Sequence, residues 1–147
     1  MAQQPPDGID ISSDPARLDV DAVHAFLSGT YWSAGIPRAV LELALANSLC
    51  FGAYDGRRQV GFARVVTDRA TFAWLCDVFV VESHRRRGIA DALLLAILAH
   101  PDLQKLRRWS LATRDAHPLY RRHGFVPLAD AGRAMEIRRS DVYQSLV

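Results

Sequence analysis

A short basic segment, Arg85-Arg86-Arg87-Gly88-Ile89-Ala90, has the residue types and spacing of an anion-binding site. It stands between an apolar run typical of a strand and an apolar run typical of a helix. The first turn of a helix carries backbone N–H groups without intrahelical partners, and the helix dipole favours negative charge there. Gly88 and Ala90 let an anion approach the backbone, and the arginines add charge-assisted hydrogen bonds. The segment therefore predicts a phosphate or pyrophosphate site, with a basic helix start that only packs as the alternative.

A second candidate segment is Tyr120-Arg121-Arg122-His123-Gly124-Phe125, which closes a short helical pattern. Together the two segments resemble the signature motifs of the GCN5-related N-acetyltransferase (GNAT) superfamily. Arg85-x-x-Gly88-x-Ala90 resembles that family's Gln/Arg-x-x-Gly-x-Gly/Ala loop, and Tyr120-x-x-x-Gly124-Phe125 resembles its Tyr-x-x-x-Gly-Phe ending. The resemblance covers roughly Leu49 to Leu128, and the first 48 residues share only the order of the helices.

The resemblance implies an N-acetyltransferase that uses acetyl-CoA, needs no metal, and acts on a small-molecule amine or a peptide. The strand before the basic loop would splay from its neighbour, and its backbone would pair with the pantetheine arm of coenzyme A. The loop amides would hold the pyrophosphate, so the backbone matters more there than the arginine side chains. The implied cofactor-binding residues are Phe79, Val80, Val81, Arg85, Arg86, Arg87, Gly88, Ile89, Ala90, Thr113 and Tyr120.

Tyr120 is the candidate general acid, because it matches the tyrosine that in many family members protonates the departing thiolate of coenzyme A. A phenol of ordinary pKa, about 10, can donate that proton and recover it from solvent. The alternative is that Tyr120 only packs against the cofactor. Thr113 stands seven residues earlier, where many relatives carry asparagine, and its hydroxyl is a weaker candidate for a contact with pantetheine.

Asp77 is the candidate general base, because many relatives carry an acidic residue at this strand position. A carboxylate in an apolar strand is costly unless it is paired, and desolvation would raise its pKa. An ion pair with an arginine such as Arg64 is the alternative, and Glu82 is the second candidate base. His84 and His117 also fall near the predicted site, but both are expected to be surface histidines.

Direct attack of the amine on the thioester, without a covalent intermediate, is the expected chemistry. A regular strand would place Asp77 and Phe79 on one face and Cys76 on the other. Cys76 would then point away from the site and be a poor nucleophile.

The aromatic segment Thr30-Tyr31-Trp32-Ser33-Ala34-Gly35, before the second helical pattern, is the candidate wall of the acceptor site. Tyr31 and Trp32 lie in this segment, Trp74 and Phe72 could contribute from the central strand, and residues 130–133 could contribute from a later turn. Such a wall can hold an alkyl or aromatic amine, or contact a protonated one through its rings. The alternative is that the aromatic side chains simply cover the core.

Periodicity and turn residues predict the elements that position these groups. The expected helices run from Asp19 or Asp21 to about Ser28, from Pro37 onward, over Arg87–His100 and over Asp115–His123. The expected strands are Ile9–Ser12, Leu49–Tyr54, Gln59–Thr67, Thr71–Val81, Arg108–Thr113, Phe125–Leu128 and Ala134–Ile137, with a hairpin turn at Asp55-Gly56.

This order predicts one α/β (α+β) domain with a mixed, mostly antiparallel sheet and helices on both faces. The crossover from the strand at 71–81 through a helix to the strand at 108–113 makes those two strands parallel. Ligands bind in such sheets at the carboxyl ends of the strands. In the resembled family this central pair splays to hold coenzyme A. The domain is expected over residues 9–147, after a disordered tail at 1–8.

Composition narrows the classes of function. Of the 147 residues, 50% are hydrophobic and 23% are charged, as in ordinary globular proteins, and the net charge of +2 is too small to favour nucleic acid. Cys50 and Cys76 have no metal-ligand spacing and are expected to be reduced and buried. The sequence lacks an apolar run long enough to span a membrane, so a soluble, cytoplasmic protein is expected. A catalytically silent acyl-CoA sensor with the same fold is the alternative function, and a homodimer is a candidate assembly because such folds commonly form one.

Overall fold

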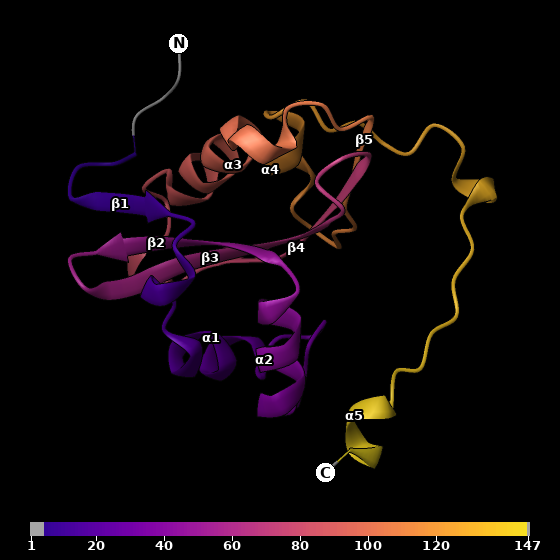
Figure 1. The fold of residues 1–147 in the computed structure, drawn as a ribbon, viewed down its shortest axis with the longest axis horizontal. Helices are drawn as coiled ribbons and strands as arrows, with labels where there is room; N and C mark the ends of the chain where they lie inside the picture. Colours follow the sequence, from indigo (N-terminus) through magenta and orange to yellow (C-terminus); the bar gives the residue numbers. More distant parts are fainter. Residues whose placement is uncertain (1–4, 147) are drawn as a thin grey trace.

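A computed structural model gives the fold and describes residues 5–146. The strands are β1 (Ile9–Ser12), β2 (Leu49–Asp55), β3 (Arg58–Thr67), β4 (Phe72–Val80) and β5 (Arg108–Ser110). The helices are α1 (Val20–Leu27), α2 (Arg38–Ala46), α3 (Ile89–Ala99), α4 (His117–Arg121) and α5 (Val142–Ser145). The strands form one sheet in the order β1-β2-β3-β4-β5, in which only β4 and β5 run parallel (Figure 1). This confirms the predicted mixed, mostly antiparallel sheet with its parallel pair.

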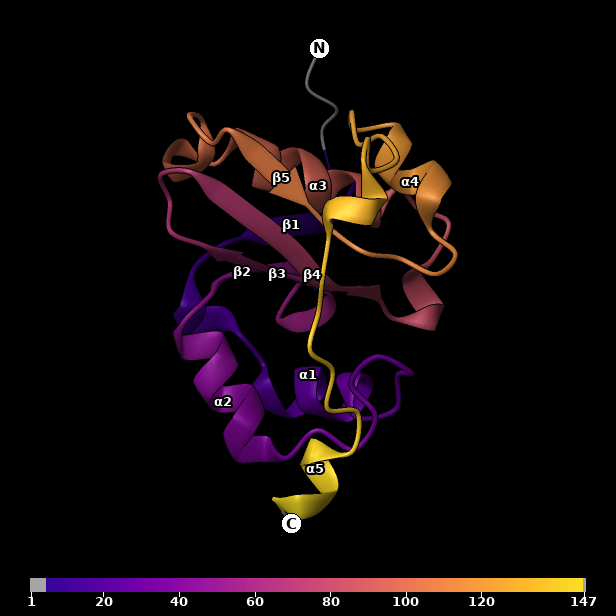
Figure 2. The ribbon, with the colours of Figure 1, turned by 90° about the vertical axis from the view of Figure 1, so that its right-hand side faces the viewer.

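Helices cover both faces of the sheet, so each face has its own core (Figures 1 and 2). On one face, α3 buries Leu93 and Leu94 against apolar side chains of β2, β3 and β4. On the opposite face, α1 and α2 bury Leu27 and Leu41 against β3 and β4. Burying such a side chain fully contributes about 1.5–3 kcal/mol. The apolar stripes of the three helices therefore hold the sheet between two layers.

Local signals in the sequence set the helix starts. The side chain of Asp19 accepts a hydrogen bond from Ala22 N at 3.0 Å and caps α1, as predicted. Helix α2 begins directly after Pro37. Helix α3 begins at Ile89 rather than at the predicted Arg87, because Gly88 adopts the left-handed conformation (φ 80°) and cannot extend the helix.

Strand β4 contains a bulge that the sequence does not reveal. Phe62 pairs with Phe79 and Arg64 pairs with Cys76, so two residues of β4 face one residue of β3 between them. Asp77 has a φ of 54°, which is unusual for a residue other than glycine. The prediction of regular alternation through β4 is therefore wrong. Leu75, before the bulge, joins the core under α3, while Phe79, two positions after Asp77, joins the core under α1 and α2.

The segment after α4 differs most from the sequence prediction. Strand β5 is shorter than the predicted Arg108–Thr113, and neither Phe125–Leu128 nor Ala134–Ile137 forms a strand. Residues 126–142 are all exposed and run as an arm that stands off from the sheet until α5 (Figure 1). Apolar and polar residues alternate from Met135 to Arg138, but a strand needs a neighbour for its backbone groups, and the arm has none in the described chain.

The predicted tail is only partly covered, because residues 1–4, like Val147, lie outside the described residues. Within the remainder, Pro6 accepts a hydrogen bond at its carbonyl from Ile9 N at 3.0 Å. None of the helices between residues 5 and 146 combines the length and apolarity that a membrane crossing requires.

Candidate active site

The two parallel strands separate where the site is expected. Pairing of β4 with β5 ends at Trp74 and Ser110, whereas β4 continues to Val80 along β3. From Leu75 onward, the edge of β4 that faces β5 therefore has no strand partner in the described chain. The carbonyl of Val80 on this edge accepts a hydrogen bond from Arg85 Nε at 3.0 Å. A free strand edge of this kind can pair with an extended, amide-bearing ligand.

The basic loop follows this edge directly and presents its backbone. A short 3-10 turn at Glu82–His84 leads into the loop, where Arg86 (φ 63°) and Gly88 (φ 80°) both adopt left-handed conformations. Over the described residues, the N–H groups of residues 86–90 have no hydrogen-bond acceptor, and no side chain caps α3. Among residues 5–146, a Cβ built on Gly88 would meet only Pro6 Cγ, at 4.0 Å. The loop thus offers N–H groups without an acceptor among the described residues, with open space beside Gly88, as an anion site requires.

His84 connects the basic loop to the end of strand β2. The prediction of a surface histidine is wrong here, because the ring is buried and its Nε2 lies 2.9 Å from Asp55 Oδ2. Its Nδ1 lies 2.8 Å from Ser83 Oγ. The hydrogen bond from His84 lowers the pKa of Asp55. His84 therefore ties the loop to the end of β2, whereas His117, at the start of α4, is exposed as expected.

An acidic residue that sequence reasoning missed joins the two motifs. Asp91, in the first turn of α3, lies 2.7 Å from His123 Nε2 and accepts from Arg122 Nε and Nη2 at 3.3 and 3.2 Å. Burial by itself would raise the pKa of Asp91, but the hydrogen bonds from Arg122 and His123 outweigh it and lower that pKa. The sequence did contain a signal for this contact. Asp91 is the third residue of a helix that begins at a predicted anion site, and a carboxylate beside a bound anion needs a positively charged partner.

Tyr120 lies half-buried on α4 beside the splayed edge. Its ring packs edge-to-face on Phe125, with centroids 6.0 Å apart. Burial raises the pKa of Tyr120 to about 12, and the proximity of Tyr31 and Cys76 adds to the shift. The phenol is therefore protonated throughout the neutral range and close to residues from both β4 and the aromatic segment.

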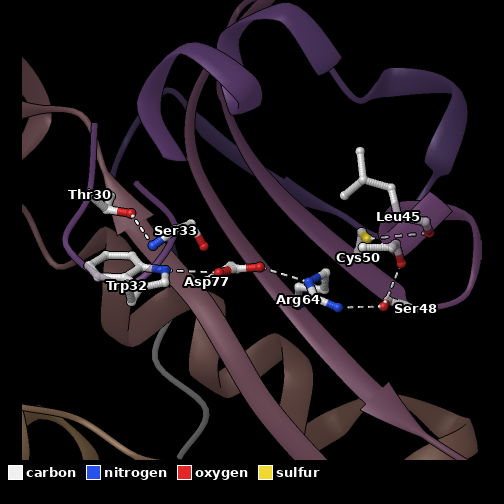
Figure 3. Close-up of polar contacts among 9 residues, drawn as sticks. Thr30, Trp32, Ser33, Leu45, Ser48, Cys50, Arg64 and Asp77 are labelled. Atoms are coloured by element: carbon white, nitrogen blue, oxygen red, sulfur yellow. Dashed lines mark hydrogen bonds and ion pairs between the residues drawn. The ribbon is translucent and has the colours of Figure 1, made fainter. Parts of the chain in front are cut away.

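Asp77 sits at the bulge and holds two partners at once (Figure 3). Its Oδ2 accepts from Arg64 Nε at 2.7 Å, and its Oδ1 accepts from Trp32 Nε1 at 2.8 Å. Its side chain is 7% exposed and that of Arg64 is 19% exposed, so the pair is largely shielded from water. Arg64 also donates to Ser48 Oγ at 3.0 Å. The ion pair with Arg64 was the alternative considered for Asp77, while the contact with Trp32 was not foreseen.

Cys76 lies on the Arg64 side of the strand rather than away from Asp77. The bulge brings the two residues to the same side, and the expectation that they point apart is wrong for that reason. Burial raises the pKa of the Cys76 thiol to about 11. A thiol that stays protonated at neutral pH is a poor nucleophile. Cys76 is thus unsuited to covalent catalysis through its pKa, not through its direction.

The aromatic segment reaches across the open end of the splay. Tyr31 and Trp32 are 53% and 43% exposed and pack edge-to-face, with centroids 5.1 Å apart. The Arg114 guanidinium, from the loop after β5, lies over the Tyr31 ring at 3.8 Å. Trp74 stands at the closed end, opposite Ser110. Trp32 is therefore linked to β4 through Asp77, and Tyr31 to the loop after β5 through Arg114, relations that spacing alone did not indicate.

Two predicted contributors lie differently from expectation. The Thr113 hydroxyl accepts a hydrogen bond from Ala116 N at 3.0 Å and so shapes the entry to α4. Residues 130–133 lie on the exposed arm, apart from the aromatic segment (Figure 1). Two surface hollows, of about 210 and 240 Å³, are lined by other residues, around Tyr54 and around Cys50 respectively, and do not coincide with the splay.

Known proteins resemble this chain in sequence and in fold. Residues 46–127 match the family described as the acetyltransferase (GNAT) domain. A Gibberella zeae protein named as a putative acetyltransferase is 34% identical over 134 residues, covering 75% of this chain and 74% of its own. A crystal structure from Xanthomonas campestris pv. campestris, described as a putative acetyltransferase of the GNAT family, is 48% identical with a TM-score of 0.90, covering 95% of this chain and 99% of its own.

A more distant neighbour shares the fold alone. It is described as a predicted acetyltransferase with acetyl-CoA from Clostridium acetobutylicum, and it is 13% identical with a TM-score of 0.66, covering 88% of this chain and 96% of its own. The family match spans more than half of the chain, and it includes both the basic loop and Tyr120. The protein belongs to the GNAT superfamily of acetyltransferases.

Proposed function

We propose that this protein transfers an acetyl group from acetyl-CoA to a primary amine by direct attack within a ternary complex. The observation that carries the proposal is the combination of a free β4 edge with the unpartnered N–H groups of residues 86–90 immediately after it. Pantetheine amides are suited to the edge, and the pyrophosphate is suited to the loop. Family membership supports acetyl transfer, and the acceptor is our proposal.

The binding roles follow from these groups. The backbone of Phe79, Val80 and Val81 would pair with pantetheine, and the loop amides would hold the pyrophosphate. Arg85 would keep the Val80 carbonyl oriented, since it already donates to that oxygen. Asp91 would repel a pyrophosphate so close to the helix start, and its pairing with Arg122 and His123 offsets that charge.

In the proposed chemistry, the amine nitrogen forms a bond to the thioester carbon and the carbon–sulfur bond breaks. The departing thiolate takes a proton from Tyr120, which remains protonated because the pKa of its phenol is raised to about 12. The attacking nitrogen loses one proton to solvent water, and solvent returns a proton to the Tyr120 phenolate, so the products are the amide and the free thiol of coenzyme A. Asp77 was the predicted base that takes the proton of the amine. Both of its oxygens accept hydrogen bonds, which instead supports a role in positioning Trp32 beside the acceptor.

The aromatic segment supports an acceptor that carries an apolar or cationic group next to its amine. Tyr31 and Trp32 offer half-exposed ring faces at the open end of the splay. Ring faces of this kind bind alkyl, aromatic and cationic groups. A small-molecule amine or a peptide N-terminus both fit this description.

Calorimetry with acetyl-CoA tests the binding site. Gly88→Glu should weaken binding by about 10–100-fold, because a side chain and a negative charge enter the loop that would hold the pyrophosphate. Gly56→Glu is the matched control, since Gly56 has a similar φ of 60° and open space around it but lies in the β2–β3 turn. Equal affinity in the two folded variants would refute the loop assignment.

Thiol release across a panel of amines tests the chemistry. Tyr120→Phe should lower kcat by about 100-fold or more and leave the affinity for acetyl-CoA nearly unchanged, because only the proton donor is lost. Unchanged kcat would remove the general-acid role.

A silent acyl-CoA sensor is the second candidate, and two contacts favour it. The Thr113 hydroxyl already accepts from Ala116 N, and the Asp77 carboxylate already accepts from Arg64 and Trp32, so both groups have structural partners that do not depend on catalysis. The same panel separates the candidates. Binding of acetyl-CoA without acetylation of any amine would favour the sensor, and amine-dependent thiol release would exclude it.

A further inference from the structure

Arg114 is fixed at the open end of the splay without an anionic partner. It is exposed in the loop between β5 and α4, and its guanidinium stacks over the Tyr31 ring at 3.8 Å. Among the described residues, no carboxylate lies within ion-pair distance of Arg114, although several other arginines of the chain are paired in this way. An arginine that is held in place but lacks an anion can bind one from a ligand.

A series of contacts connects Arg114 to the groups proposed for acetyl transfer. Asp77, at the bulge of β4, accepts from the Trp32 indole at 2.8 Å (Figure 3). Trp32 packs edge-to-face with Tyr31, and Tyr31 carries the Arg114 guanidinium. Tyr31 is also close to Tyr120, the proposed proton donor. The guanidinium therefore lies beside the proposed acceptor site and not on a remote surface.

The stacked arginine decides which charge an acceptor can carry at this point. Arg114 already occupies one face of the Tyr31 ring, and it would repel a second cation placed beside it. Stacking covers the flat face of a guanidinium but leaves its N–H groups, which lie in the plane of the group, able to donate to both oxygens of a carboxylate. A positive charge here also favours the neutral, attacking form of a bound amine.

We infer that Arg114 selects an acceptor that carries a carboxylate next to its primary amine, so that the acceptor is an amino carboxylic acid. The inference rests on the proposed function, because it assigns the acceptor of the same acetyl transfer. Arg114 binds the carboxylate, and the half-exposed ring of Trp32 contacts the apolar part of the acceptor. The amine, which is bound by neither group, is left to attack the thioester.

Steady-state kinetics with matched acceptors measure this selection. L-Phenylalanine, its primary amide and phenethylamine form an aromatic series, and L-leucine, its primary amide and isoamylamine form an aliphatic one. Arg114→Gln should lower kcat/KM for the two amino acids by about 10–100-fold, chiefly through KM, because a charge-assisted bidentate contact is lost. For the amides and the simple amines the change should stay within about 2-fold. The ratio of wild type to variant is taken for each acceptor, which cancels differences in amine basicity.

Controls separate the carboxylate from other roles of Arg114. Arg57→Gln is the matched variant, because Arg57 is also exposed but lies in the turn between β2 and β3, and it should leave all rates unchanged. An equal fall in kcat/KM for every member of a series would show that Arg114 only supports the loop. A rise in KM for acetyl-CoA alone would show that the guanidinium binds a cofactor phosphate. Either result overturns the inference, as does a wild type that acetylates only acceptors without a carboxylate.

Binding of the acetylated products distinguishes failure of this inference from failure of the proposed function. Calorimetry in the presence of coenzyme A compares N-acetyl-L-phenylalanine and N-acetyl-L-leucine with their primary amides. The carboxylates should bind the wild type at least about 10-fold more tightly than the amides, and Arg114→Gln should bind both equally. Equal affinity in the wild type, or no binding of either form, overturns the inference even where amines are acetylated. Selective binding without acetylation of any amine refutes the proposed transfer and leaves the carboxylate site in place.

Discussion

Asp77→Asn should lower the free energy of unfolding by about 3 kcal/mol. Removing one partner of a buried ion pair typically costs about 3–5 kcal/mol, because the other charge is left unpaired. We expect the lower end of this energy range, because the Arg64 side chain is 19% exposed and keeps its hydrogen bond to Ser48 after the substitution. The amide that replaces the carboxylate can still accept at one oxygen, so part of the contact with Trp32 or Arg64 survives.

Urea unfolding followed by tryptophan fluorescence measures this change. With a slope of about 2 kcal/mol per molar urea, the midpoint should fall by roughly 1.5 M. Arg38→Gln removes an exposed ion-paired arginine and should leave the midpoint unchanged. Arg64→Met combined with Asp77→Leu should recover part of the loss, because no charge is then left buried. A loss below about 1 kcal/mol for Asp77→Asn would refute the buried-pair reasoning.

The KM and kcat of Asp77→Asn then show whether Asp77 is a general base or a residue that positions the aromatic segment. If Asp77 positions the aromatic segment, Asp77→Asn and Trp32→Phe should both raise KM for the acceptor, because the first weakens and the second removes the same hydrogen bond at 2.8 Å. A fall in kcat of about 100-fold confined to Asp77→Asn would show instead that the carboxylate takes the proton.

Two further changes test the core and the link between the motifs. Tyr54→Phe should raise the free energy of unfolding by about 1 kcal/mol, because it removes a buried hydroxyl that has no partner among the described residues; a lower Tm would contradict this. Asp91→Asn should reduce the fall in the free energy of unfolding that occurs when the pH is lowered from about 6 to about 3. The folded-state pKa of Asp91 is below its ordinary 3.8, so its contribution is present above about pH 4 and is lost as the pH falls through the folded-state pKa. Urea titrations at about pH 6 and pH 3 measure the difference, and equal pH dependence in wild type and variant would contradict the assigned pairing.

The parts of the site that depend on local chain chemistry could be predicted from the sequence. Asp55-Gly56 marks the β2–β3 turn, and Gly88 marks the start of α3 to within two residues. The order strand, basic loop and helix is enough to place free N–H groups at residues 86–90. The family resemblance then added Tyr120 and the splayed strands, and the family match confirms the resemblance itself.

The parts that depend on tertiary partners could not be predicted. Nothing in the local sequence indicates that Trp32 reaches Asp77, 45 positions away, or that Arg114 covers Tyr31. The strand predicted at Ala134–Ile137 failed for a related reason. Alternation indicates which face of a segment is apolar, but it does not indicate whether a strand edge is available for the segment to pair with.

The bulge makes Asp77 an added residue in an otherwise regular strand. Without it, Leu75 and Val78 would be two positions apart, and both belong to the core under α3. Cys76 and Phe79 would likewise share the opposite face. Loss of one codon would therefore remove the carboxylate and keep every remaining side chain of β4 on its present side. The fold of the sheet therefore does not depend on Asp77. A related chain that lacks Asp77, and with it the contact with Trp32, can keep the same fold.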